Sequence, residues 1–135
     1  MLARLLSLPS IFVLLFLGLI PITFPIFSEH EGEMFPVVEN VTVWITDIEE
    51  DGVIIYTSFD KVRSCEYIGI SWYDEAGKRL VFDLTDSHGP RSRPIREDQF
   101  AGPWKIYGIQ ALEGTEAIVS HRCNPYWITY TRFFP

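Results

Sequence analysis

The sequence is poor in the residues that bind metal ions. It has two cysteines, Cys65 and Cys123, and three histidines, His30, His88 and His121, with neither a Cys-x-x-Cys nor a His-x-x-x-His spacing. The imidazole and thiolate ligands of a tightly bound metal commonly come in such closely spaced pairs. We therefore expect no metal centre, no cofactor and no catalytic residue, and we interpret the histidines as surface or half-buried side chains.

Charge is absent from a long stretch near the start of the chain. After Arg4, the 23 residues from Leu5 to Phe27 carry no charged side chain, and the next Lys or Arg is Lys61. As a helix this run would be about 35 Å long, against a hydrocarbon core of roughly 30 Å. We therefore expect residues 1–27 to be an N-terminal transmembrane anchor. The positive-inside rule then places the N-terminus in the cytoplasm and the C-terminal domain in the periplasm or outside the cell.

A cleaved signal peptide is the alternative for the same segment. Ser10 to Ile20 has the length of a signal-peptide core. A signal-peptide cleavage site needs a small residue three positions before the cut. The candidate cuts after Gly18, Thr23 and Ser28 all lack one, so the uncleaved anchor is favoured. Pro21 and Pro25 are expected to end or kink the helix near its outer end.

Basic charge is also scarce in the rest of the chain. Residues 28–135 carry a net charge of −8, because the net charge of −7 for the whole chain includes Arg4. Binding to nucleic acid through bulk charge is therefore disfavoured. The length suffices for one domain with a modest core. We expect residues 28–36, which are rich in Glu, to be a linker and residues 37–135 to be a β domain.

Apolar residues of this domain recur with the two-residue period of β-strands. Seven short strands are expected, at residues 41–46, 53–59, 65–73, 79–84, 104–112, 117–123 and 126–134. The third and fourth should form a hairpin around Asp74–Gly77, and residues 86–103 should be a long polar loop. These features predict an all-β fold, either an antiparallel sandwich of about seven strands or a partly open barrel. Core packing is expected for the four tryptophans, Trp44, Trp72, Trp104 and Trp127.

The segment from Ile70 to Leu80 has Trp72-Tyr73 followed by a Gly and a Leu. It resembles the run across the C and C′ strands of immunoglobulin-like domains, which implies an immunoglobulin-like sandwich. The cysteine placement differs, because Cys65 lies seven residues before Trp72 on the same expected strand. The overall layout, one span and a compact β domain, is similar to that of small single-span membrane proteins of bacterial viruses.

The two cysteines fall in the part of the chain expected outside the cytoplasm. An oxidising compartment would allow Cys65 and Cys123 to form a disulfide between the start of the third strand and the end of the sixth. In a reducing cytoplasm they would instead be buried free thiols. A catalytic pair of His121 with Cys123 would need a free thiol and conflicts with the disulfide.

Two segments are candidates for binding a protein partner. The loop from His88 to Arg96 contains Arg91, Arg93 and Arg96, whose guanidinium groups can make bidentate contacts with carboxylates. They could equally pair with acidic neighbours within the domain. Tyr126 and Trp127 follow the Asn124–Pro125 turn and could form an exposed aromatic platform, for a protein or a carbohydrate.

Two further motifs are incomplete. Asp47, Glu49 and Asp51-Gly52 recur like the start of a calcium loop, but the twelfth position holds Ser58 in place of the bidentate Glu. We interpret them as an acidic turn. Asn40-Val41-Thr42 fits the glycosylation triplet, which matters only in a eukaryotic secretory pathway.

Two functions of different class are compatible with these features. The favoured one is a membrane-tethered, non-catalytic β domain that binds a protein partner or serves as an accessory subunit of an envelope or virion assembly. The alternative is an envelope hydrolase that acts on glycans through paired carboxylates.

Overall fold

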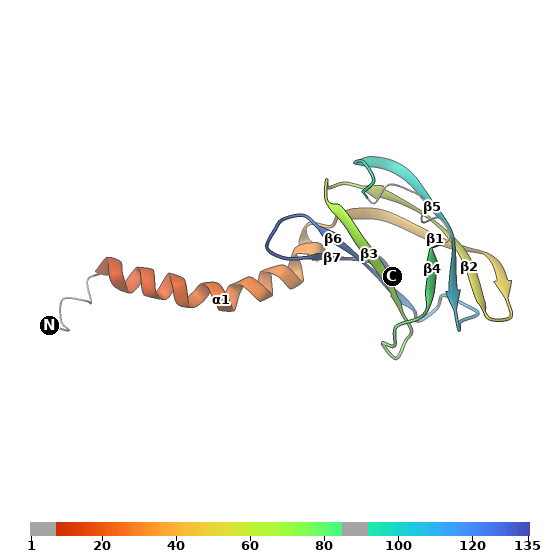
Figure 1. The fold of residues 1–135 in the computed structure, drawn as a ribbon, viewed down its shortest axis with the longest axis horizontal. Helices are drawn as coiled ribbons and strands as arrows, with labels where there is room; N and C mark the ends of the chain where they lie inside the picture. Colours follow the sequence, from red (N-terminus) through yellow and green to blue (C-terminus); the bar gives the residue numbers. More distant parts are fainter. Residues whose placement is uncertain (1–7, 85–91) are drawn as a thin grey trace.

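The computed structural model describes residues 8–84 and 92–135, which form one long helix and seven β-strands (Figure 1). The helix α1 (Leu8–Met34) projects from one end of the β domain. The strands are β1 (Val38–Glu49), β2 (Gly52–Lys61), β3 (Glu66–Tyr73), β4 (Phe82–Leu84), β5 (Arg96–Tyr107), β6 (Glu116–Arg122) and β7 (Thr129–Phe134).

The strands form two antiparallel sheets. One sheet has the order β1-β2-β5-β4 and the other has the order β3-β6-β7. The expected all-β domain with seven strands is therefore confirmed, and the separation into two sheets favours the sandwich over the partly open barrel.

The core lies between the two sheets. Side chains of a strand point alternately to its two faces, and in β2 the inward positions include Val53, Ile55 and Phe59, all buried. Aromatic rings join the sheets, since Trp72 of β3 packs with its ring centroid 5.8 Å from that of Phe82 in β4. Full burial of a large apolar side chain contributes about 1.5–3 kcal/mol.

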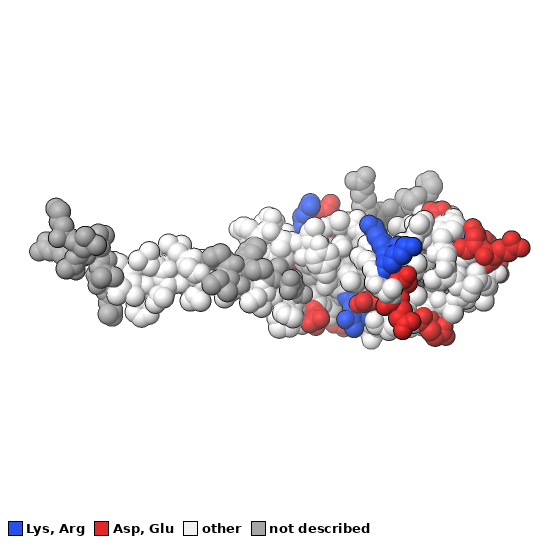
Figure 2. All heavy atoms as spheres, turned by 90° about the horizontal axis from the view of Figure 1, so that it is seen from below, with Lys and Arg blue, Asp and Glu red and all other residues white. Residues whose placement is uncertain are grey.

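The two ends of the sandwich differ in what they join. At the end that we call proximal, α1 enters, β2 connects to β3, and β6 connects to β7. At the opposite end, called distal, lie the turns at residues 49–52, 74–81 and 108–115. Acidic side chains are prominent at the end of the domain farthest from α1 (Figure 2).

The expected hairpin around Asp74–Gly77 forms only at the residue pair next to the turn, and the expectation that its second strand continues to pair with β3 is wrong. Gly77 has the expected positive φ, 75°, and Tyr73 pairs with Arg79 in an isolated bridge. The chain then crosses to the other sheet, where β4 pairs with β5. This crossing allows Phe82 to pack inside, because it brings the ring between the sheets.

Two other expectations need correction. The loop expected at residues 86–103 ends early, because β5 begins at Arg96 and pairs with β2. Polar and exposed side chains on its first half hide the strand pattern. Trp44 is not a core residue. Its ring lies on the outer face of β1, 37% exposed, and stacks on Tyr56 at 6.4 Å.

The helix α1 is longer than expected. It continues through Pro21 and Pro25, so the expectation that they end it is wrong, and it includes residues 28–34 of the expected linker. Each proline removes one helical hydrogen bond, but packing of the last turns against β7 supports the helix beyond them. Across the described residues, no helix is both long and apolar enough to be identified as a membrane span.

Candidate functional site

A buried carboxylate joins α1 to the β domain. Glu31 Oε2 accepts hydrogen bonds from Trp127 Nε1 at 2.5 Å and Thr129 Oγ1 at 2.8 Å. Glu31 Oε1 accepts one from Arg63 Nη2 at 2.8 Å. The donors come from the β6–β7 connection, from β7 and from the β2–β3 connection. A single side chain of α1 therefore holds together three segments that are distant in the sequence.

The backbone of α1 also lies directly against the domain. Gly32 is buried, and a Cβ added there would lie 1.7 Å from the carbonyl oxygen of Tyr130, so only glycine permits this approach. Arg63 Nη1 donates to the carbonyl oxygen of Phe35 at 2.6 Å, and the amide of Val37 donates to Thr131 Oγ1 at 3.3 Å. These contacts fix the direction in which α1 leaves the domain.

The junction favours the charged form of Glu31. Burial by itself would raise the pKa of this carboxyl group, but the hydrogen bonds from Trp127, Arg63 and Thr129, together with the positive charge of Arg63, outweigh it. The pKa of Glu31 is therefore held below its ordinary value. The residues flanking Glu31 at the same end of the helix behave differently, since Glu33 is exposed and pairs with His30 Nδ1 at 3.2 Å.

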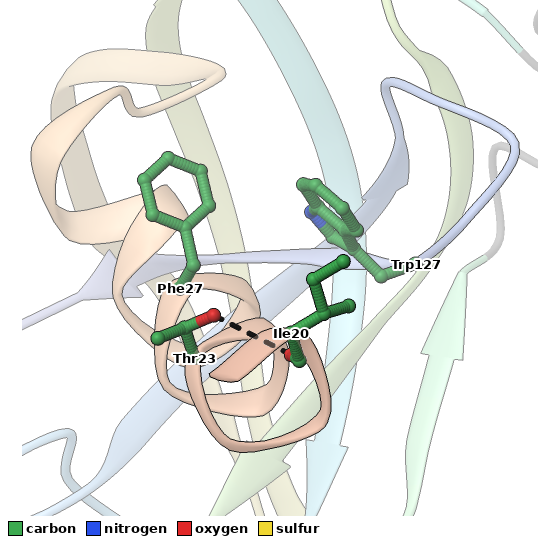
Figure 3. Close-up of a pocket in the computed structure, with 4 residues that line it drawn as sticks. All are labelled: Ile20, Thr23, Phe27 and Trp127. Carbon is green, nitrogen blue, oxygen red and sulfur yellow. Dashed lines mark hydrogen bonds between the residues drawn. The ribbon is translucent and has the colours of Figure 1, made fainter. Parts of the chain in front are cut away.

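An apolar groove opens next to this junction. It has a volume of about 290 Å³ and is lined by Ile20, Thr23, Phe27 and Trp127 (Figure 3). The rings of Phe27 and Trp127 meet edge to face with their centroids 6.1 Å apart. The hydroxyl group of Thr23 donates to the carbonyl oxygen of Leu19 at 3.0 Å, and Trp127 Nε1 points to Glu31. The groove walls therefore present mainly carbon atoms.

Tyr126 and Trp127, the candidate aromatic platform, lie beside this groove. Asn124 Oδ1 accepts hydrogen bonds from the amides of Tyr126 at 2.9 Å and Trp127 at 3.2 Å, an Asx turn that orders the loop. Tyr126 is 75% exposed, whereas Trp127 is only partly exposed and packs against α1. The two side chains are adjacent, with ring centroids 6.3 Å apart.

The three arginines of the candidate binding loop do not share one role. Arg91 and His88 lie outside the described residues. Arg93 is half-buried, with its guanidinium group 5.8 Å from the centre of the Phe59 ring, and it donates to the carbonyl oxygen of Phe100 at 2.8 Å. Arg96 is exposed at the start of β5. Arg93 is thus a packing residue, a role that sequence reasoning missed.

The interior near the proximal end is polar. Lys61 is buried, and its Nζ donates to the carbonyl oxygens of Cys65 at 2.9 Å and Arg93 at 2.6 Å. His121 is buried beside Tyr67, and its Nδ1 has no hydrogen-bond partner among the described residues. Burial, helped by the charges of Lys61 and Arg63, lowers the pKa of His121 to about 4. The imidazole is therefore neutral at physiological pH.

The disulfide between Cys65 and Cys123 is confirmed. Their Cα atoms lie 4.5 Å apart, within the range that a disulfide allows. It links the start of β3 to the end of β6, as expected. A thiol nucleophile at Cys123 activated by His121 is therefore incompatible with this structure.

The acidic turn of the sequence binds an amine of the same domain. Lys105 Nζ pairs with Asp51 Oδ1 at 2.7 Å and with the carboxylate of Glu49. The hydrogen bonds that Lys105 Nζ donates to Asp51 and Glu49 raise the pKa of Lys105. In the described part of the chain, no three His, Cys, Asp or Glu side chains gather in a way that could hold a metal ion.

Glu31, Gly32, Arg63 and Thr129 are residues of the junction that sequence reasoning did not single out. Glu31 and Gly32 lie among Glu29, His30 and Glu33, in a polar segment with the composition of an exposed linker. A comparison with known proteins identifies no relative, because no family model, no characterised protein and no solved structure matches this chain.

Proposed function

We propose that this protein is a membrane-attached, non-catalytic β domain that binds a protein partner, as an accessory subunit of an envelope or virion assembly. The observation that carries the proposal is that α1 is apolar along much of its length and is locked to the domain. Phe12, Leu14 and Phe16 are all more than 60% exposed. Exposing so many large apolar side chains to water is unfavourable, and lipid would cover them.

The proposed anchor is the uncharged run from Leu5 to Phe27, with its N-terminus in the cytoplasm. A disulfide persists in oxidising compartments, so the pair Cys65–Cys123 supports a domain outside the cytoplasm. Protease added to intact cells or spheroplasts should remove a tag at the C-terminus, and the mature chain should begin at Met1 or Leu2. A soluble product that begins near Ser28 would instead identify a cleaved signal peptide.

We also propose an immunoglobulin-like fold for the domain. The sheet orders β1-β2-β5-β4 and β3-β6-β7 correspond to the orders A-B-E-D and C-F-G of constant-type immunoglobulin domains. Trp72, on the third strand, is fully buried, like the core Trp on strand C of that family. The disulfide differs, because it links β3 with β6 within one sheet and not the second with the sixth strand. Such a fold hosts many functions and by itself names none.

Partner binding is assigned to Arg96, which is exposed at the start of β5, and to Arg91, which lies outside the described residues. Their guanidinium groups suit carboxylates on a partner. Arg93 is left unchanged in the test, because its removal would disturb Phe59 and Phe100. Arg96 is exposed, and loss of an exposed charge costs under ~1 kcal/mol. We therefore expect the variant Arg91→Ala with Arg96→Ala to fold normally, yet to lose the protein that crosslinks to the wild type in native membranes.

The matched control is Arg79→Ala with Arg132→Ala, which removes the same charge from two exposed distal positions. It should retain the crosslinked partner. Equal retention in both double variants would contradict the arginine assignment. A measurable turnover of glycans that is lost on substitution of a single carboxylate would replace the binding proposal with the hydrolase.

A further inference from the structure

The loop between β6 and β7 resembles a membrane-interface element in composition. Residues 123–128 contain no charged side chain, and they place Tyr126 and Trp127 beside α1. Trp and Tyr are enriched where the hydrocarbon core of a bilayer meets the headgroups, because their rings combine an apolar body with a polar group. Tyr126, 75% exposed, is the most exposed large apolar or aromatic side chain in the described part of the chain.

The groove below the loop favours an apolar occupant. Its four lining residues, Ile20, Thr23, Phe27 and Trp127, present carbon to the open side (Figure 3). The Thr23 hydroxyl group already donates a hydrogen bond to a backbone carbonyl group of α1, and the indole N–H of Trp127 donates one to Glu31. A polar ligand would have to give up its water without gaining these hydrogen bonds. An acyl chain makes no hydrogen bonds to water and therefore loses none when it enters the groove.

The position of the groove along α1 agrees with a bilayer boundary. Between Leu8, where α1 begins, and Phe27 of the groove lie 19 helical steps, which amount to about 28 Å, close to the thickness of a hydrocarbon core. The first charged side chains after the run, Glu29 and Glu31, follow Phe27 by two and four residues. The loop therefore lies at the level where apolar chain gives way to charged chain.

The acidic side chains of the domain also favour an approach to the membrane by the proximal end. The distal turns, residues 49–52, 74–81 and 108–115, hold six acidic and two basic side chains. Membrane surfaces that contain anionic lipids repel such turns. The rigid junction at Glu31 points these turns away from α1 (Figure 2), so only the proximal end can approach the headgroups.

From these observations we propose that the groove and the Tyr126–Trp127 loop are a lipid-contact site. The two aromatic rings lie in the interfacial region of the bilayer, and a phospholipid acyl chain fills the groove between α1 and Trp127. The proximal end of the domain then contacts the membrane surface, and the orientation of the domain relative to the membrane is fixed. This inference depends on the membrane attachment proposed above.

The test uses full-length protein in vesicles of phosphatidylcholine whose acyl chains carry bromine near the headgroup. Bromine quenches only tryptophans that touch the lipid. In Tyr126→Trp, the added emission should fall severalfold in brominated relative to ordinary vesicles. The matched control is Val81→Trp, at a distal position that is 69% exposed, whose added emission should not change. Both positions are exposed, so neither substitution should disturb folding.

Flotation of the same samples separates the two proposals. If the protein floats with the vesicles and Tyr126→Trp is quenched, the lipid-contact site is supported. If it floats and Tyr126→Trp is no more quenched than Val81→Trp, the site is overturned and the attachment is retained, leaving the loop for a protein partner. If the protein does not float with vesicles, the attachment and the lipid-contact site are both wrong.

Discussion

The two ends of the sandwich interior are stabilised by different chemistry. The distal half buries apolar side chains such as Trp72, Ile106 and Ala117, all with no exposed surface. The proximal half buries polar ones, among them Lys61 and His121. Apolar burial is non-directional and scales with area, whereas a buried polar group needs partners in a defined geometry. The distal core therefore consists mainly of apolar packing, whereas the proximal half combines apolar side chains such as Val37 and Phe59 with buried polar ones and determines how α1 is attached.

The disulfide and the buried polar contacts described above also lie at one end of the sandwich. The disulfide, the Lys61 hydrogen bonds and the Glu31 junction are all at the proximal end. A disulfide and hydrogen bonds each require a defined geometry, so these contacts hold the proximal end in one arrangement.

The largest expected effect is the loss of the distal core. Trp72→Ala should lower the free energy of unfolding by about 3–5 kcal/mol, because it removes a fully buried ring and leaves a cavity. Trp44→Ala, on the outer face, should cost less than half as much. Urea unfolding of the full-length protein in detergent, followed by near-UV circular dichroism, measures both. Equal losses would mean that the distal core does not dominate the stability.

Removal of the disulfide should come next. Cys65→Ala with Cys123→Ala releases a loop with a sequence separation of 58 residues, which costs up to about 4 kcal/mol in the chain-entropy model. The same unfolding measurement on the double variant gives the loss. As a control, neither thiol of the non-reduced wild type should react with an alkylating reagent, and rapid alkylation would contradict the pairing.

Glu31→Ala should weaken the junction by about 2–3 kcal/mol, because it leaves Trp127 Nε1, Thr129 Oγ1 and Arg63 without their charged acceptor. The effect should be local. Hydrogen exchange should accelerate in residues 30–37 and in the β6–β7 connection, with little change in β2 and β5. Glu33→Ala removes an exposed carboxylate one residue beyond Gly32 and should leave the exchange unchanged. A uniform acceleration throughout the domain would contradict a separate junction.

The smallest of these effects should be a pH dependence from His121. Its pKa falls from 6.5 to about 4 on folding, so the unfolded chain binds a proton in a pH range where the folded protein does not. Stability is therefore complete above pH 6.5 and is lost as the pH falls toward 4, by roughly 2 kcal/mol at pH 5.

Urea unfolding of His121→Phe and of the wild type, each at pH 7 and at pH 5, tests this prediction. Phe keeps the ring and removes the titration, so the difference in stability between pH 7 and pH 5 should become smaller. A variant with the same pH dependence as the wild type would place the titration elsewhere. Glu31 should add its own loss only at lower pH, because its pKa is depressed on folding and its contribution disappears as the pH falls through that lowered value.

Much of the distal half could be predicted from the sequence. The apolar run from Val53 to Phe59 predicts β2 as a central strand, since a short run that is apolar on both faces is typical of a strand inside a sheet. Gly77 identifies the turn after β3 because its positive φ suits glycine. Burial of Trp72 follows from its place on an apolar strand. At the proximal end, the pairing of the two cysteines was also predictable, since the domain has only these two.

The proximal half could not be predicted in the same way. Glu31 and Glu33 are chemically identical in the sequence, yet one is buried by Trp127, Thr129 and Arg63 and the other is exposed. The partners of Glu31 lie 32 to 98 residues away, and no local pattern carries that information. Arg93 likewise looked like a surface cation and is held over Phe59.

By itself, therefore, the sequence determined the apolar run, the β domain, its seven strands and its disulfide, because composition and two-residue periodicity are local properties. Tertiary structure alone decided that β3 and β4 belong to different sheets, that α1 continues to Met34, and that Glu31 joins it to the domain. These outcomes depend on contacts between distant segments, in which a buried polar group finds its partners only after the chain has folded.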